Sequence, residues 1–261
     1  MASGRIFRQL RIALLLFILL LVAGDAWLAG SRSTDWDDAL WVAIYPINSD
    51  GGAVAASYIS RLRDDVFSPL EDYFPRQAGR YGLAQKELVK VRLGPEVKTL
   101  PPVPPKDGNV LAVMWWSLKL RFWAMQTGLG MDGPPADIRI YVIYHDPARQ
   151  PRLAHSLGLK EGLIGVVNAY ASKAYSGRNN VVIAHEPLHT LGATDKYDMA
   201  SGQPLFPEGY AQPERKPLYP QHKAEVMGGR IPLSSTRSDI PGSLKRTLIG
   251  PTTATEINWL E

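Results

Sequence analysis

The sequence predicts a mixed α/β domain of the α+β kind that follows one hydrophobic N-terminal helix. An apolar run near the N-terminus predicts that helix. Segments with strand-like alternation and segments with helical spacing follow it along the chain. Near residue 185, two histidines stand four residues apart within a segment of helical character. We therefore expect one folded domain in which strands, helices and a histidine-bearing helix occur together.

The first 30 residues are expected to lie outside the folded domain. Three arginines precede a strictly apolar run of thirteen residues, 12–24, and apolar residues resume after Asp25. Counted through residue 30, this stretch has nineteen residues, about enough to span a membrane. We predict a cytoplasmic tip and an uncleaved transmembrane signal anchor over 1–30. The alternative is a cleaved signal peptide, which a thirteen-residue apolar core also suits.

In both cases the basic N-terminus stays in the cytoplasm, and residues 31–261 form an exported domain. We therefore expect a single-pass protein of the inner membrane whose domain lies on the periplasmic side. Removing residues 1–30, with Arg5, Arg8, Arg11 and Asp25, leaves 26 basic and 24 acidic side chains and a net charge of +2. This balance gives no electrostatic reason to expect nucleic acid as a partner.

The chain contains no cysteine. Its absence excludes disulfides, thiol catalysis and thiolate metal sites. Any metal ion bound by this chain must therefore use histidine and carboxylate ligands.

Alternation and β-branched composition predict strands at 40–47, 88–93, 137–144 and 163–171. Apolar spacing predicts helices at 53–74, 109–127 and 243–260. Turn residues mark 48–52 and 176–180, and loops are expected at 100–105 and 200–221. The tryptophans of the 109–127 helix, Trp115, Trp116 and Trp123, are interpreted as core residues, with the wall of a substrate cleft as the alternative.

The segment 181–195 has the pattern H-E-x-x-H-x-x-G-x-x-D. Two histidines four apart on a helix share one face, so His185 and His189 can reach one zinc ion. Glu186 follows the first of them and can hold a water molecule rather than the metal. If the helix ends at Gly192, the chain can turn back and offer Asp195 as the third ligand. The alternative is a surface helix with two solvated histidines.

Pro187 lies between the two histidines and lacks an N–H. We therefore expect either a kink in the helix or a helix that begins late enough to place Pro187 in its first turn. His145 and His155 are each interpreted as hydrogen-bonded structural residues rather than ligands. Met227 precedes two glycines and is expected in a tight turn under the metal site, with a core filler as the alternative.

The H-E-x-x-H-x-x-G-x-x-D motif, followed some thirty residues later by Met227, resembles the metzincin zinc metalloproteases. Aspartate as third ligand resembles the snapalysin-type variant, and the exported region is similar to a group of membrane-anchored bacterial proteins with this motif. The resemblance implies a mixed twisted sheet, an active-site helix and a smaller C-terminal subdomain.

By this resemblance, His185, His189 and Asp195 would bind one Zn²⁺ per chain, and Glu186 would be the general base. Met227 would form the turn beneath the site. The sequence lacks a tyrosine directly after Met227, and Tyr197 is the substitute that we expect to assist the oxyanion.

The function that the resemblance implies is a membrane-anchored zinc endopeptidase that hydrolyses polypeptide substrates. The alternative is a non-catalytic, zinc-stabilised extracytoplasmic binding domain in which Pro187 distorts the position of the base.

Overall fold

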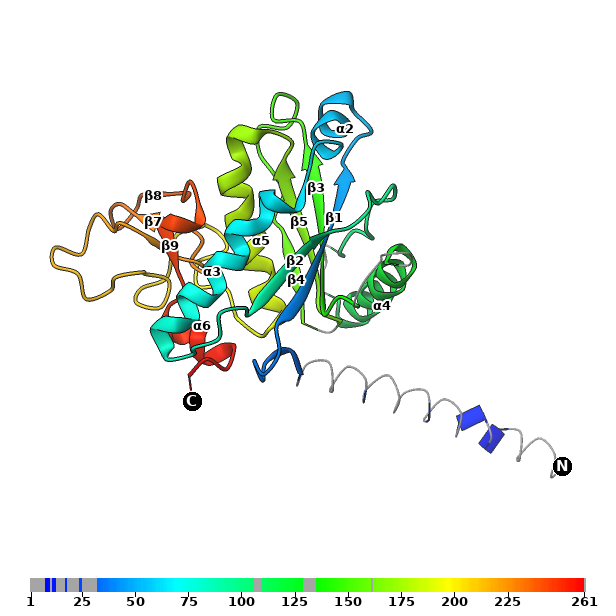
Figure 1. Cartoon of the computed structure of the whole chain (residues 1–261), viewed down its shortest axis with the longest axis horizontal. Helices are drawn as coiled ribbons and strands as arrows, with labels where there is room; N and C mark the ends of the chain where they lie inside the picture. Colours follow the sequence, from blue (N-terminus) through cyan, green and yellow to red (C-terminus); the bar gives the residue numbers. More distant parts are fainter. Residues whose placement is uncertain are drawn as a thin grey trace.

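The computed structural model of this chain describes residues 32–105, 109–128, 135–160 and 162–260, together with six isolated positions before residue 25. The longer elements, labelled in Figure 1, are β1 (Leu40–Asn48), α2 (Ala53–Ile59), α3 (Ser68–Ala78), β2 (Val89–Leu93), α4 (Val110–Thr127), β3 (Ile138–His145), β4 (Leu157–Leu159), β5 (Ile164–Tyr170) and α5 (Ser176–Thr190). The C-terminal part adds β6 (Ala224–Glu225), β7 (Ile231–Pro232), β8 (Ser238–Asp239), β9 (Thr247–Leu248) and α6 (Pro251–Glu256).

A five-stranded mixed sheet forms the centre of the molecule, with strand order β2-β1-β3-β5-β4. Strands β2, β1, β3 and β5 are parallel, and β4 pairs with β5 in the antiparallel direction at one edge. The helices that connect the parallel strands cover the two faces of the sheet. The predicted mixed α/β class is therefore confirmed.

Side-chain alternation along the strands divides the core into two parts. Residues such as Val42 and Ile44 of β1 face a core that includes α3, α5 and α6. Their neighbour Tyr45 faces the other side, where Trp116 and Leu120 of α4 cover the sheet. Figure 1 shows α3 and α5 on one side of the sheet and α4 by itself on the other.

A smaller C-terminal region follows α5 and contains two short two-stranded sheets, β6-β9 and β7-β8. The segment 200–221 is largely irregular, as expected, with two isolated bridges at Pro204 and Tyr210. Figure 1 places this region beside α3 and α5.

Three sequence-based expectations, two for helices and one for a turn, need correction. The predicted helix at 53–74 is divided into α2, a 3-10 turn (Asp64–Phe67) and α3, because Arg63 is extended and Pro69 favours a new helix start. The predicted turn at 176–180 is the first part of α5. The predicted helix at 243–260 is reduced to α6, because residues 247–248 pair with β6 and Pro251 begins the helix.

The interpretation of the tryptophans in α4 is confirmed only for Trp116, which is buried. Trp123 is partly buried, and Trp115 is 61% exposed. Strand β4 was absent from the predicted elements, since three residues are too short to show alternation.

The predicted signal anchor at 1–30 lies outside the described residues, apart from isolated positions. None of the described helices combines the length and the hydropathy needed to cross a membrane.

Candidate metal centre

The predicted zinc ligands His185 and His189 lie on one face of α5, and their ring centroids are 4.7 Å apart. Two glycines allow this helix to approach the edge of the sheet closely. A Cβ on Gly158 of β4 would lie 2.5 Å from His189 Cβ, and a Cβ on Gly165 of β5 would lie 3.3 Å from Glu186 Cβ. Larger residues at these two positions would separate the helix from β4 and β5.

The chain leaves α5 through a glycine turn, as the sequence predicts. Gly192 has a φ of +110°, its N–H donates to His189 O at 3.0 Å, and Ala193 N–H donates to Leu188 O at 2.9 Å. These two hydrogen bonds form the Schellman arrangement that ends many helices. The reversal directs the chain back toward the histidines and brings Asp195 beside them.

Three potential ligand atoms converge at this point. His185 Nε2 lies 3.0 Å from His189 Nε2, and Asp195 Oδ1 lies 3.1 and 3.2 Å from these two nitrogens. Ligand atoms about 2.0–2.1 Å from a tetrahedral metal ion are roughly 3.3 Å apart. Among the described residues, these three form the one group of histidine and acidic side chains that could hold a metal ion. The spacing fits a small divalent cation.

The hydrogen bonds of the ring Nδ1 atoms show why a cation is needed. His185 Nδ1 is 2.9 Å from Val226 O, and His189 Nδ1 is 2.8 Å from Ala193 O. A carbonyl oxygen only accepts, so both Nδ1 atoms must carry the proton. In the neutral rings, both Nε2 lone pairs then face each other and the Asp195 carboxylate. Three converging acceptors require a metal ion or an added proton between them.

The charges around the group support the same conclusion. Burial opposes a charge on His185, but the hydrogen bond to Asp195 and the negative charge of Glu186 outweigh it and raise the pKa of His185 to about 9. Burial alone would raise the pKa of Asp195, but hydrogen bonds from the two histidines hold it well below its ordinary value. The site therefore stabilises positive charge at the point where the three atoms meet.

Glu186 is 3% exposed, and its Oε2 atom has no hydrogen-bond partner among the described residues. Burial raises the pKa of its carboxyl group, and the charges of His185 and His189 partly oppose this shift. A buried carboxylate oxygen without a partner is costly unless a ligand or water molecule satisfies it. Its position beside the ligand group makes it available to a molecule bound there.

Residues 225–229 form a tight turn, and Val226 of this turn contacts His185. Gly228 and Gly229 donate their N–H groups to Glu225 O, at 3.1 and 3.0 Å, and Gly229 has a φ of +70°. Met227 is fully buried in this turn and also belongs to the main core, so the turn and the core-filler interpretations both apply. Met227 O accepts from Lys196 N at 2.9 Å, which joins the turn to the residue after Asp195.

The sequence-based prediction missed Glu225. This carboxylate is fully buried and accepts hydrogen bonds from Gly228 N at 2.8 Å, Gly250 N at 3.0 Å and Thr253 Oγ1 at 2.8 Å. It therefore connects the methionine turn to α6. Nothing in the local pattern around Glu225 distinguishes it from a solvent-exposed glutamate.

A second missed contact fixes the loop that carries Asp195. Lys196 is buried, and its Nζ lies 2.6 Å from Glu256 Oε2 at the end of α6. Glu256 also accepts from Thr194 N at 3.1 Å and from Thr194 Oγ1 at 2.6 Å. These contacts hold the residues on both sides of Asp195 against α6.

The structure corrects one expectation about Pro187. Helix α5 begins eleven residues before Pro187 and ends three residues after it, so the expected late start is wrong. The proline lies in the last turn, where its carbonyl accepts from Thr190 Oγ1 at 2.7 Å and from Leu191 N at 3.1 Å.

Tyr197 lies beside the ligand group. Burial, together with the negative charges of Asp195 and Glu186, raises the pKa of Tyr197 to about 12. Its ring approaches Gly229 of the methionine turn, whose Cβ would lie 4.0 Å from Tyr197 Cδ1. The phenol therefore keeps its proton at neutral pH and can donate a hydrogen bond.

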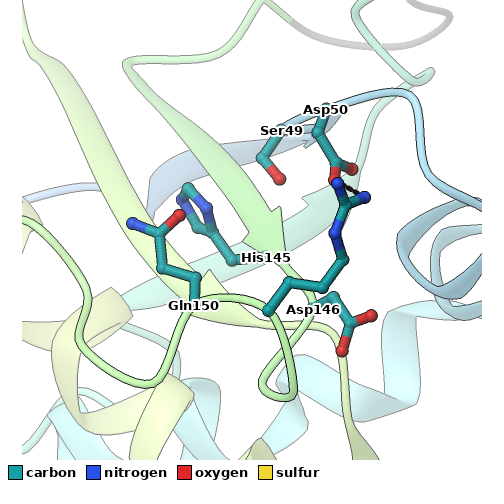
Figure 2. Close-up of a pocket in the computed structure, with 6 residues that line it drawn as sticks. Ser49, Asp50, His145, Asp146 and Gln150 are labelled. Carbon is teal, nitrogen blue, oxygen red and sulfur yellow. Dashed lines mark hydrogen bonds and ion pairs between the residues drawn. The ribbon is translucent and has the colours of Figure 1, made fainter.

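His145 is hydrogen-bonded as predicted, with Nε2 2.8 Å from Asn168 Oδ1. It lines a hollow of about 110 Å³ at the carboxyl ends of β1 and β3 (Figure 2). Asp50 and Arg149 form an ion pair of 2.6 Å across the same hollow. Among the described residues, the hollow holds no group of histidine and acidic side chains that could bind a metal ion.

No family model matches the sequence, and no curated protein matches it. Solved structures do match, among them a chain described as "Structure of a chaperone-substrate complex", at 12% identity and a TM-score of 0.39. The match covers 85% of this chain and 34% of that one, so this chain spans about a third of the length of its match. Similarity at this level does not establish a common fold or a shared function.

Proposed function

We propose that this protein is a membrane-anchored zinc metalloprotease that hydrolyses peptide bonds on the periplasmic side of the inner membrane. The observation that carries the proposal is the convergence of His185 Nε2, His189 Nε2 and Asp195 Oδ1 within 3.2 Å of one another, next to the buried carboxylate of Glu186. The mixed sheet beneath α5 and the small C-terminal region are consistent with the metzincin resemblance.

The donor set favours zinc as the metal. Two imidazoles and one carboxylate leave a position open in a tetrahedral site, which is typical of catalytic rather than structural zinc. A bound zinc ion would polarise the scissile carbonyl and make a water molecule more acidic.

The chain's own residues would supply the remaining chemistry. Val226 O and Ala193 O orient the two histidines, so that Nε2 of each faces the metal position. Glu186 would accept a proton at its free Oε2 and pass it to the leaving amine, and its raised pKa suits a base that works near neutral pH. Tyr197 would donate a hydrogen bond to the developing oxyanion.

The position of β4 supports a polypeptide as the substrate. Strand β4 is the edge strand next to α5, and Gly158 lies directly beside His189 and Glu186. An extended peptide that added to the outer edge of β4 would pass in front of the metal position.

The decisive experiment compares the full-length protein with its Glu186→Gln variant in detergent. Metal content is measured by mass spectrometry, and cleavage is measured on a broad peptide library with and without a chelator. We expect about one zinc per chain in both proteins and a loss of cleavage of about 10²–10⁴-fold in the variant. Glu208→Gln, at an exposed position thirteen residues after Asp195, is the matched control and should cleave normally.

Two results would contradict the proposal. A protein that stays metal-free under zinc-replete conditions would exclude the metal centre. A protein that binds zinc but shows no chelator-sensitive cleavage would favour the non-catalytic binding domain.

A further inference from the structure

Helix α4 has apolar residues on two opposite faces. Its inner face, with Trp116, Leu120 and Ala124, packs on the sheet. Eight large apolar side chains of the helix are exposed. Val113 is one of them and lies toward the inner side, and the other seven form the outer face: Val110, Leu111, Met114, Trp115, Leu118, Phe122 and Met125. At about 100° per residue, these seven side chains occupy an arc of about 140° that faces away from the sheet.

This outer face is too large and too apolar to be an ordinary solvated surface. Trp115 is 61% exposed and Phe122 is 58% exposed. The loop that carries the exposed residues Leu100 and Val103 is attached at the other side of α4, so these two residues are not part of the outer face. The loop is held against α4 because Trp123 Nε1 donates to Thr99 Oγ1 at 2.9 Å and Trp116 Nε1 donates to Pro102 O at 2.8 Å. Contiguous apolar patches of this kind mark contact surfaces.

The charges of α4 indicate what kind of surface it contacts. The helix contains no acidic residue and two basic ones, Lys119 and Arg121. Lys119 Nζ lies 5.4 Å from the centre of the Trp115 ring at one flank of the apolar arc. A helix with exposed Trp, Phe and Leu and with basic residues only is suited to the interface of an anionic bilayer.

The first residues of the folded domain lie only a few residues after the predicted membrane segment. Trp36 is buried, and its Nε1 donates to Ile257 O at 2.7 Å, so the chain is fixed to the domain from this residue onward. Only residues 31–35 separate it from the predicted membrane segment, and Ser33 among them is itself buried, so that segment ends within a few residues of the domain. The domain would therefore be held directly against the membrane.

The C-terminal end of α4 lies near the end of the sheet at which strands β1 and β3 begin. A Cβ on Gly128 would lie 3.8 Å from Arg139 Nε at the start of β3, and Asp137 N donates to Trp41 O at 2.9 Å. The end of α4 and the start of β1, which follows the tether, therefore lie at the same end of the parallel strands, although Trp36 itself packs on the opposite face of the sheet.

We propose that the outer face of α4 lies in the membrane interface and orients the domain on the bilayer. The proposal rests on the membrane anchor of the proposed function. The helix would lie along the surface rather than cross it, because its inner face stays packed on the sheet. The bilayer would then be in contact with the side of the sheet opposite α5, which leaves the metal centre accessible from the aqueous side.

The absence of cysteine from the chain makes a direct test possible. Single cysteines are introduced by Leu118→Cys and Phe122→Cys, and by Ser57→Cys on the exposed surface of α2 as a control. Each full-length variant is labelled with a polarity-sensitive fluorophore and reconstituted into vesicles of phosphatidylcholine with phosphatidylglycerol. Quenching by nitroxide-labelled lipid and by aqueous iodide is then compared.

We expect the labels at 118 and 122 to be quenched several-fold more by the lipid nitroxide than the label at 57, and several-fold less by iodide. Iodide quenching equal to that at 57 would show that the face is in water and would overturn the proposal. Protection from both quenchers would also overturn it. In that case, dependence on protein concentration identifies a second copy of the chain as the cover, and independence identifies a segment of the same chain.

A flotation assay distinguishes the absence of a membrane anchor from the absence of a membrane contact at α4. If the full-length protein does not float with the vesicles, both the anchor and the membrane contact of α4 are wrong. If it floats while the label at 118 stays exposed to iodide, only the contact of α4 is wrong.

Discussion

His185 donates its Nδ1 proton to Val226 O at 2.9 Å, across 41 residues of sequence. This hydrogen bond turns Nε2 toward His189 and Asp195 and makes the methionine turn part of the candidate metal centre. Contacts that hold the turn in place should therefore influence metal binding without touching the metal.

Glu225→Gln tests the contact beneath the turn. An amide would present its NH₂ group to one of the donors that the carboxylate now satisfies, so a buried group would lose its partner. We expect a decrease in the free energy of unfolding of about 1–3 kcal/mol, together with weaker metal binding. Denaturant titration and chelator competition measure the two effects. The exposed Glu208→Gln variant should change neither, and an unchanged Glu225→Gln protein would contradict the assigned role.

Lys196→Met tests how the Asp195 loop is anchored. The substitution keeps the length of the side chain but removes the 2.6 Å ion pair with Glu256 and the hydrogen bonds to Thr194. We expect a stability loss of about 1–3 kcal/mol and a lower affinity for zinc, because Asp195 is less well positioned. Lys245→Met, at an exposed position in the same region, is the control. A loss of stability with unchanged zinc affinity would show that Asp195 is positioned without this ion pair.

Gly158→Ala tests the close approach of β4 to α5. The new Cβ would lie 2.5 Å from His189 Cβ and 2.7 Å from Glu186 O, so strand and helix must move apart. We expect a stability loss of about 1–3 kcal/mol and reduced metal affinity. Gly79→Ala is the matched control, because its φ is −59° and a Cβ there would meet no atom within 4 Å. That change should be neutral or stabilising by up to about 1 kcal/mol.

The raised pKa of His185 predicts how metal binding depends on pH. Because this pKa is about 9 in the metal-free protein, the ring carries an extra proton at pH 7 that the metal must displace. Zinc affinity should therefore rise as the pH increases from 7 toward 9, and binding should release a proton. Calorimetric titration in buffers of different ionisation enthalpy measures this release. An affinity that is constant across this range would contradict the shift.

The same shift affects the stability of the metal-free protein. The folded pKa of His185 is higher than the unfolded value of 6.5, so its contribution is fully present below pH 6.5. That contribution should be lost as the pH rises from 6.5 to about 9. Thermal unfolding of the metal-free protein at a series of pH values measures the loss, and added zinc should reduce it.

Tyr197→Phe tests the hydroxyl beside Asp195. With a pKa of about 12, the phenol stays protonated and can stabilise an oxyanion by donation. We expect kcat to fall by about 10²-fold with little change in KM or zinc content. Tyr175→Phe, on the 3-10 turn before α5, should have no effect. If kcat is unchanged in Tyr197→Phe, the hydroxyl has no role in the reaction.

The residue pattern within each segment was sufficient to predict most of the strands of the sheet. The predicted strands at 40–47, 88–93, 137–144 and 163–171 correspond closely to β1, β2, β3 and β5. Strands β1, β3 and β5 are mostly buried runs and β2 alternates, and both patterns depend only on the residues of the strand itself. The ligand group was predictable for the same reason, because His185, Glu186, His189 and Asp195 lie within eleven residues on one helix and the turn that ends it.

Contacts between distant segments required the tertiary structure. Glu225 meets Gly250 and Thr253, and Lys196 meets Glu256 across 60 residues, so no local spacing reveals either partner. The exposed face of α4 could not be predicted from the sequence for a related reason. Its sequence is apolar on all sides, and only packing on the sheet determines which side is buried and which remains available to a partner. The sequence by itself determined most of the strands and the candidate ligand group, because these depend on neighbours along the chain, whereas burial depends on which surfaces meet in space.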